Sequence, residues 1–273
     1  MRWLSLLLCV ACSGGGADTK DEPTDSADTD TDTDTDTDTD TDTDTDTGYG
    51  PVAQFEGVVT DAAGTPLDGF PLKLCRGPAC RNGETDGGGA FTFPNIEVDW
   101  HSFEVVPPPG SGYATALAPL VFAEDEERSI TVVMHALGPA TAMPSTPTEV
   151  EAGEGLFITV SGDDLEPPLF IDPATEVSGV RVPEGQRVPV DEDGTIIDMW
   201  YVDPFDHHAT NGGLPVRFDN LWGLGDGEVY EVWVGSYEDS EWLNAGTVTV
   251  GGGQLTGDAL LPLTSTIVLV DPS

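Results

Sequence analysis

The apolar residues of this chain recur in short β-type runs, separated by clusters of turn-forming Gly, Pro, Asn and Asp. No ten-residue stretch of the first half follows a helical period. In that half the pattern predicts strands at 53–60, 70–75, 90–93, 102–106, 114–121 and 129–135. In the second half it predicts strands at 156–160, 177–182, 194–202, 214–218, 228–234, 242–250 and 264–270. We therefore expect an all-β protein.

These strands form two groups, on either side of a Pro-rich joint at 138–147. Six short strands within about 85 residues are typical of a small antiparallel sandwich. The sequence thus predicts one antiparallel β-sandwich module at 52–136 and a second at 137–273.

Residues 12–51 have a different character, because ten Asp-Thr dipeptides run from Asp28 to Thr47 among few apolar residues. Such a segment cannot bury a core, and we expect a disordered acidic linker. Alternate Asp residues in an extended chain lie about 7 Å apart, within the ~8 Å screening length, so their repulsion stiffens the segment. The repeat shares the opening of an EF-hand loop but lacks its Gly and its bidentate Glu. A spacer is the favoured interpretation over a specific ion site.

The first residues read MRWLSLLLCVAC, with an apolar run at 3–11 after Arg2. This run is too short to cross a hydrocarbon core of ~30 Å and fits an export signal. The ending Val10-Ala11-Cys12 resembles the lipobox of bacterial lipoproteins, although Cys9 stands where Leu is usual. The resemblance implies a signal peptide at 1–11, a lipid on Cys12 and, with Ser13 next, an outer-membrane location. A plain secretory signal is the alternative.

The net charge of the whole chain is −41, and the linker does not account for all of it. From residue 51 onward, the chain contains 36 Asp and Glu residues but only seven Lys and Arg residues. Nucleic acids are bound through clustered cations that replace phosphate counterions, so a nucleic-acid partner is excluded. Anionic lipid headgroups are disfavoured for the same reason.

The chain has four cysteines. If Cys9 leaves with the signal peptide and Cys12 carries the lipid, one pair remains, Cys75 and Cys80. They flank Gly-Pro in a short loop, and an oxidising compartment favours a disulfide between them. Chain entropy assigns so small a loop only ~2 kcal/mol. The rival interpretation is half of a zinc site, which needs four ligands, and the chain has no second cysteine pair.

The first module carries a family resemblance at 55–75, FEGVVTDAAGTPLDGFPLKLC, at 84–96, ETDGGGAFTFPNI, and at 102–107, SFEVVP. These segments resemble the carboxypeptidase regulatory-like domain, a transthyretin-type β-sandwich. The departures are Gly-Gly-Gly-Ala at 87–90 and Asp-Trp-His at 99–101, and neither threatens the fold. The resemblance implies a non-catalytic module. The second module is more weakly similar to sandwiches that follow such domains in large bacterial surface proteins.

Candidate binding residues are few. The run Asp203 to His208 has metal-ligand types, but neighbouring His side chains on a strand face opposite ways, and a polar connecting loop is favoured over a metal site. The acidic run 191–194 fits calcium or an ordinary hairpin turn, and the turn is favoured. Trp200 and Trp233 each lie beside a carboxylate, an arrangement that fits glycan binding or a module interface.

The search for catalytic motifs finds no nucleophile elbow, phosphate loop or zinc-protease helix. The leading hypothesis is a non-catalytic, lipid-anchored cell-envelope protein with a structural or binding role and no cofactor. Its partner is an unidentified envelope protein or polysaccharide. The alternative is a surface glycan-binding protein that uses Trp200 and Trp233.

Overall fold

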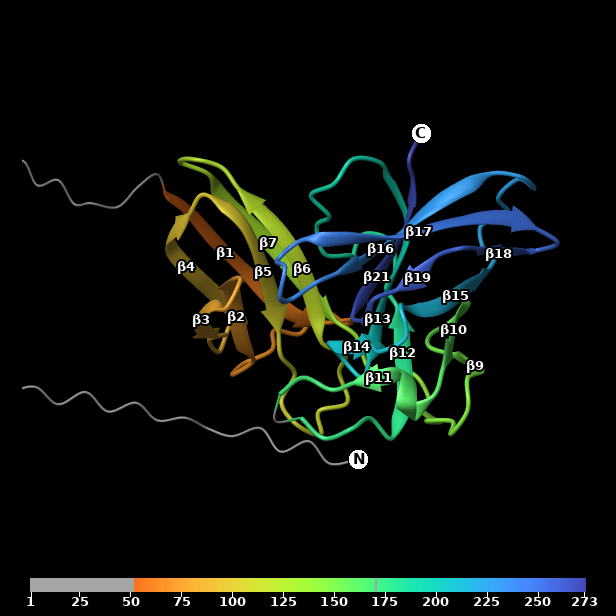
Figure 1. Cartoon of the computed structure of the whole chain (residues 1–273). Coiled ribbons are helices and arrows are strands. Elements are labelled where there is room, and N and C mark those ends of the chain that lie inside the picture. Colours follow the sequence, from red (N-terminus) through yellow and green to blue (C-terminus); the bar gives the residue numbers. More distant parts are fainter. Residues whose placement is uncertain (1–51, 170) are drawn as a thin grey trace, which may run out of the picture. The chain divides into compact units, whose positions relative to one another are not determined.

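The computed structural model describes residues 52–169 and 171–273, and these residues form an all-β fold (Figure 1). The predicted all-β class is confirmed. The predicted signal peptide, the lipid acceptor Cys12 and the acidic linker lie outside the described residues. Within the described part, no helix has the length and apolar character needed to cross a membrane.

Residues 52–134 form a sandwich of two sheets, with strand orders β4-β1-β7 and β3-β2-β5-β6. The strands are β1 (Val52–Asp61), β2 (Pro71–Arg76), β3 (Ala79–Glu84), β4 (Ala90–Glu97), β5 (Asp99–Val105), β6 (Ala116–Phe122) and β7 (Glu127–Met134). Alternate residues of β1 point between the sheets, where Phe55 meets Phe103 edge-on with ring centroids 4.8 Å apart. This aromatic contact lies within the core that joins the two sheets.

Two features of this sandwich depart from the sequence expectation. Strand β3 is extra: its residues are mostly exposed and polar, so the apolar pattern carries no sign of it. Strand β1 pairs with β7 in parallel, although an antiparallel sandwich is expected. Before β7 the chain passes through the opposite sheet in β5 and β6, and such a crossover allows parallel pairing.

Residues 141–271 form the second set of sheets, and all their strand pairs are antiparallel. The longest sheet runs β8-β12-β13-β21-β16-β17-β18-β15-β10-β9, and a smaller one runs β11-β14-β20. The strands to β14 are β8 (Thr141–Ala142), β9 (Thr148–Glu151), β10 (Leu156–Val160), β11 (Leu165–Glu166), β12 (Glu176–Arg181), β13 (Thr195–Asp203) and β14 (His207–Ala209). The rest are β15 (Leu214–Asp219), β16 (Val229–Gly235), β17 (Trp242–Gly251), β18 (Gln254–Gly257), β19 (Leu260–Leu261), β20 (Leu263–Thr264) and β21 (Thr266–Asp271).

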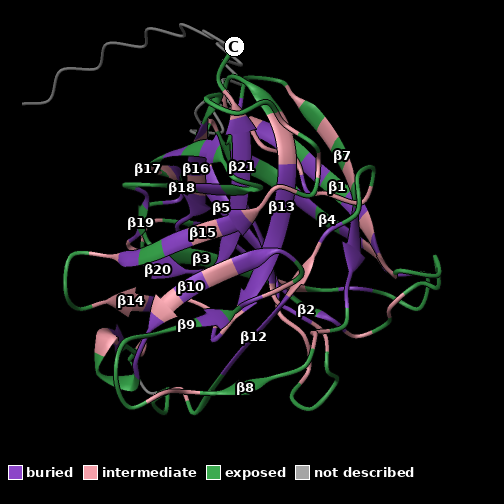
Figure 2. Cartoon of the chain, turned by 90° about the vertical axis from the view of Figure 1, so that its right-hand side faces the viewer, coloured by how far each residue is buried: buried purple, intermediate pink, exposed green. Residues whose placement is uncertain are grey.

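The central strands of this sheet, β13 and β21, are buried on both faces, as their largely purple ribbons in Figure 2 show. On one face Met199 and Val268 belong to a core that is continuous with the first sandwich. On the other face Trp200 and Ile267 belong to the inner core of the second. The described residues of the two sandwiches accordingly belong to one compact unit.

The second sandwich also closes an open sheet edge of the first. Strand β6 lies at the edge of its sheet, so its outward backbone groups need partners. The Leu117 N–H donates to Thr266 Oγ1 at 3.2 Å, and Trp242 Nε1 donates to the Pro119 carbonyl at 3.1 Å. The Val121 N–H donates to Asp191 Oδ2 at 2.9 Å. Pro119 needs no donor partner, which suits it to this edge.

Asp191 holds the joint in a second way, because Arg128 of β7 donates to both of its carboxylate oxygens at 2.6 Å. The predicted hairpin turn at 191–194 therefore includes an ion pair to the first sandwich. Both side chains are less than a fifth exposed, so solvent screens this pair less than a surface ion pair.

Thr266→Val tests the edge contact. The Thr266 side chain is fully buried, and Val has nearly the same shape but no acceptor for the Leu117 N–H. We expect the free energy of unfolding to fall by about 1–3 kcal/mol, the usual effect of leaving a buried donor unpaired. Chemical denaturation of Thr266→Val beside Thr249→Val, an exposed strand position, measures this. Equal effects at the two positions would show that the bond contributes nothing.

Candidate functional site

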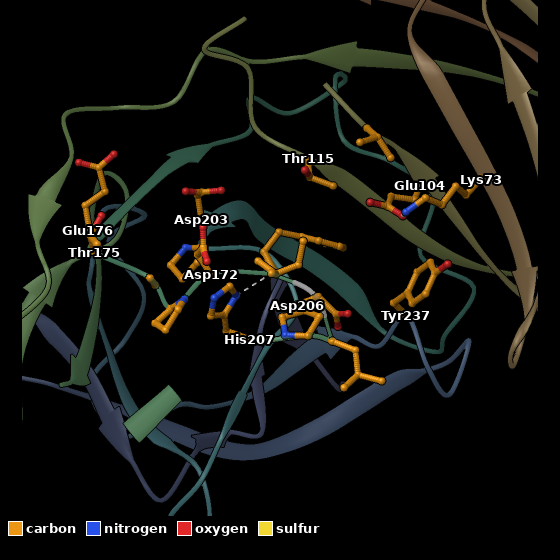
Figure 3. A pocket seen from close by; sticks show the side chains of 18 residues that line it. Lys73, Glu104, Thr115, Asp172, Thr175, Glu176, Asp203, Asp206, His207 and Tyr237 are labelled. Carbon is orange, nitrogen blue, oxygen red and sulfur yellow. Dashed lines mark hydrogen bonds and ion pairs between the residues drawn. The ribbon is translucent and has the colours of Figure 1, made fainter. Parts of the chain in front are cut away.

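A pocket of about 630 Å³ lies where the two sandwiches meet (Figure 3). The first sandwich contributes Lys73 of β2, Glu104 of β5 and Thr115 to its lining. The second contributes residues 203–207, the segment 171–176 and Tyr237. The pocket therefore exists only in the assembled pair of sandwiches.

The turn at 203–207 sets the position of two of the polar side chains. Strand β13 ends at Asp203, the Asp203–Pro204 peptide is cis, and Asp206 has a φ of 57°. Asp tolerates this left-handed backbone better than most residues do. The Asp206 N–H donates to the Thr264 carbonyl at 2.6 Å, and His207 then begins β14 beside β20. Asp206 and His207, whose side chains are drawn in Figure 3, are thus held by backbone pairing.

His207 is only 3% exposed and has one ring nitrogen engaged. Its Nδ1 lies 3.0 Å from the Phe205 carbonyl. A carbonyl only accepts, so Nδ1 carries the proton, and in the neutral ring Nε2 is an acceptor. This Nε2 is buried and has no hydrogen-bond partner among the described residues, and the same holds for Asp206 Oδ1. The turn therefore presents two buried acceptors without donors.

Carboxylates dominate the charge of the pocket. Burial raises the pKa of Asp206 to about 6 and raises the pKa of Asp203 above its ordinary value. Burial also raises the pKa of Glu104, although Lys73 Nζ donates to Glu104 Oε2 at 3.1 Å and opposes that effect. Asp172 and Glu176 line the same pocket, in which Lys73 is the cation. The site disfavours anions.

The predicted disulfide between Cys75 and Cys80 is confirmed, and it adjoins this wall. The Tyr237 hydroxyl lies 3.0 Å from both sulfur atoms, and Lys73 Nζ lies 5.4 Å from the Tyr237 ring centroid. Ser240 Oγ donates to the Cys75 carbonyl at 3.2 Å. The bridge between β2 and β3 thus forms part of the contact with the loop after β16.

The two tryptophans of the glycan hypothesis do not form a common platform. Trp200 is 0% exposed, lies in the inner core of the second sandwich, and donates from Nε1 to the Glu154 carbonyl at 3.0 Å. Trp233 is half-buried and packs against the core that the two sandwiches share, on the other face of the sheet. Its Nε1 donates to Glu231 Oε2 at 2.9 Å. A sugar has no access to the Trp200 ring in this fold.

The metal-type residues at 203–208 do not assemble a ligand set. Among the described residues, no group of three or more His, Cys, Asp and Glu side chains is arranged to hold a metal ion. His208 Nε2 and Asp206 Oδ1 are 3.8 Å apart, an ion pair only when the ring is protonated. The run acts as a turn and a short strand.

Lys73, Glu104 and Tyr237 are pocket residues that the sequence does not indicate. Lys73 lies between Leu72 and Leu74, and Glu104 lies between Phe103 and Val105. In an alternating strand these are ordinary solvent-facing positions. Only the second sandwich, which covers that face, makes them part of a site.

Comparison with known proteins leaves this chain without an established family. No protein-family model matches the sequence, and no curated protein matches it. A solved structure from Bacteroides uniformis, described as a carbohydrate-binding protein, is 8% identical to this chain, with a TM-score of 0.27. The similarity covers 81% of this chain and 80% of that protein's chain.

Two pilins are also similar. The Streptococcal ancillary pilin is 19% identical, with a TM-score of 0.28, and the similarity covers 56% of this chain and 53% of the pilin chain. The full-length major pilin SpaD from Corynebacterium diphtheriae is 12% identical, with a TM-score of 0.29, and the similarity covers 78% of this chain and 84% of the pilin chain. At these TM-scores the similarities carry no argument about function.

Trp200→Ala tests the packed role of this ring. Removing a fully buried Trp leaves a cavity beside Phe218 and Trp222, so we expect a loss of about 3–5 kcal/mol in the free energy of unfolding. Trp233 is half-buried, so Trp233→Ala should lower the free energy of unfolding clearly less. Denaturant titration measures both, and a fully stable Trp200→Ala protein would contradict the packing.

Asp206→Asn tests the electrostatics of the pocket. Asp206 has a raised pKa in the folded state, so its ionised form opposes folding, and this penalty is present above pH 6 and absent below about pH 4. Asn tolerates the backbone at this position and carries no charge. We expect Asp206→Asn to raise stability by about 1–2 kcal/mol at pH 7.5, after allowance for solvent screening, and to have little effect at pH 4.

Unfolding curves at several pH values measure this difference, with Asp226→Asn, an exposed position, as the matched control. A gain that is constant from pH 4 to pH 7.5, or a loss at pH 7.5, would contradict the assignment.

Proposed function

We propose that this protein is a non-catalytic, lipid-anchored binding protein of a bacterial cell envelope, with its ligand site in the pocket between the two sandwiches. The observation that carries the binding role is the pair of buried acceptors, Asp206 Oδ1 and His207 Nε2, that have no donor among the described residues. Buried polar groups are almost always paired with protein or with ordered water, so two such acceptors in the wall of one pocket support a ligand that donates N–H groups.

The construction of the joint supports a single rigid head. The two sandwiches share an apolar core, an edge-strand contact and the Arg128–Asp191 ion pair. A site made from both sandwiches keeps its shape only if they do not move against each other. This joint therefore suits a binding or structural role.

The non-catalytic character is proposed on the resemblance of 52–136 to the carboxypeptidase regulatory-like domain, which acts as a module beside other domains. The partner is an envelope protein or a polysaccharide. A glycan site made from Trp200 and Trp233 is not retained, because the two rings lie on opposite faces of one sheet.

The anchor is proposed from the sequence alone. Val10-Ala11-Cys12 after the apolar run supports lipid attachment at Cys12 and export, with the outer membrane as the location. The Asp-Thr repeat between Cys12 and the sandwiches would then act as a spacer that holds the head away from the membrane. These residues lie outside the described part of the chain.

Mass spectrometry of the native N-terminus tests the anchor. We expect the mature chain to begin at an acylated Cys12, and Cys12→Ser to move the protein from the membrane fraction to the soluble fraction. Cys9→Ser is the control, because Cys9 leaves with the signal peptide. A free amino terminus at any other residue sinks the anchor proposal.

A further inference from the structure

We infer that the pocket between the two sandwiches takes an organic cation, a primary ammonium or guanidinium group on an aliphatic stem, whose N–H groups are received by Asp206 and His207. This inference rests on the proposed function, because it names the ligand class of the same pocket.

The hydrogen-bonding character of the two side chains suits a ligand that donates N–H groups. Nδ1 of His207 donates to the Phe205 carbonyl, so Nε2 offers a lone pair. Asp206 Oδ1 is a carboxylate oxygen. A buried acceptor left unpaired carries a desolvation cost, which a ligand rich in N–H donors would offset. Asp206 and His207 both line the pocket, and 13% of the Asp206 side chain is exposed.

The charge of the pocket also favours a cation. Five carboxylates line the pocket: Glu104, Asp172, Glu176, Asp203 and Asp206. Lys73 is the one Lys or Arg among the described lining residues, and it is already engaged by Glu104. The pocket therefore carries an excess of negative charge that an incoming cation would neutralise.

The arrangement of the acceptors favours an organic cation over a metal ion. A metal ion needs several ligands converging on one point, and no such group of three occurs in the described residues. An ammonium offers three N–H donors and a guanidinium five, directed outward to separated acceptors. The apolar atoms of Val106, Pro204 and Phe205 line the same pocket and can cover an aliphatic stem.

Two sources carry this chemistry: a Lys or Arg side chain of a partner polypeptide, and a free polyamine. The experiment uses the purified full chain and four probes: Nα-acetyl-lysine amide, Nα-acetyl-arginine amide, spermidine, and Nα-acetyl-norleucine amide as the uncharged match of lysine. Binding is followed by NMR titration of the His207 ring resonances. Stronger binding of the acetylated amino acids than of spermidine indicates a partner's side chain, and the reverse order indicates a polyamine.

We expect the cationic probes to saturate and to shift the His207 resonances, and the norleucine probe to do neither. Asp206→Asn should lower the affinity for the cationic probes at least tenfold, while it makes the folded protein more stable at pH 7.5. Asp226→Asn should leave the affinity unchanged. A purely structural Asp206 would not show this opposition between stability and binding.

Affinity should also fall as the pH drops below 6. The charged and titratable groups that act on Asp206 are Lys73 of β2, Glu104 of β5, His208 of β14 and Glu238 in the loop after β16. Spermidine titrated at pH 7.5 and at pH 5 into wild type and Asp206→Asn measures this, and only the wild type should lose affinity through Asp206.

Equal binding of the norleucine probe, unchanged affinity in Asp206→Asn, or shifts confined to residues outside the pocket would overturn the cation assignment. The anchor test at Cys12 does not involve the pocket. Failure of cation binding with an acylated Cys12 therefore removes the ligand class and leaves the anchored-protein proposal in place.

Discussion

The open edge of strand β6 is the constraint on which the rest of the structure depends. Its outward N–H and C=O groups are met by side chains of the second sandwich, from Thr266, Trp242 and Asp191. An edge strand with bare backbone groups is a template for unwanted pairing, and covering it is one of the few ways to prevent this. The second sandwich thus covers a sheet edge that the first sandwich would otherwise leave open.

Closing that edge also buries the neighbouring sheet face, and this creates the pocket. Lys73 and Glu104, which face outward from β2 and β5, come to lie under Tyr237 and beside the 203–207 turn. Burying an ion pair costs desolvation that its attraction only partly offsets. In a chain with so many carboxylates, the pocket keeps five of them together, with a raised pKa at Asp206, Asp203 and Glu104. Sites that give up stability in this way are where binding is to be sought.

The disulfide shows how local and long-range effects combine. The two cysteines are only five positions apart, so the bridge constrains the unfolded chain little. Its position shows a second effect, because both sulfurs contact the Tyr237 hydroxyl. In addition, the Cys75 carbonyl accepts a hydrogen bond from Ser240 Oγ. The bridge stiffens the hairpin on which the second sandwich rests. Cysteine counting alone does not indicate that role.

The sequence by itself determined the all-β class, most strand positions and the Cys75–Cys80 bridge. These follow from period-two alternation, turn residues and cysteine spacing, which act over a few residues. It did not reveal the exposed strand β3, the parallel pairing of β1 with β7, or that Trp200 and Trp233 lie on opposite faces of one sheet. Only the tertiary structure decided these, and only it joined Lys73, Glu104, Asp206 and His207 in one pocket. Alternation shows that a strand has two faces, but it does not show which distant segment covers each face.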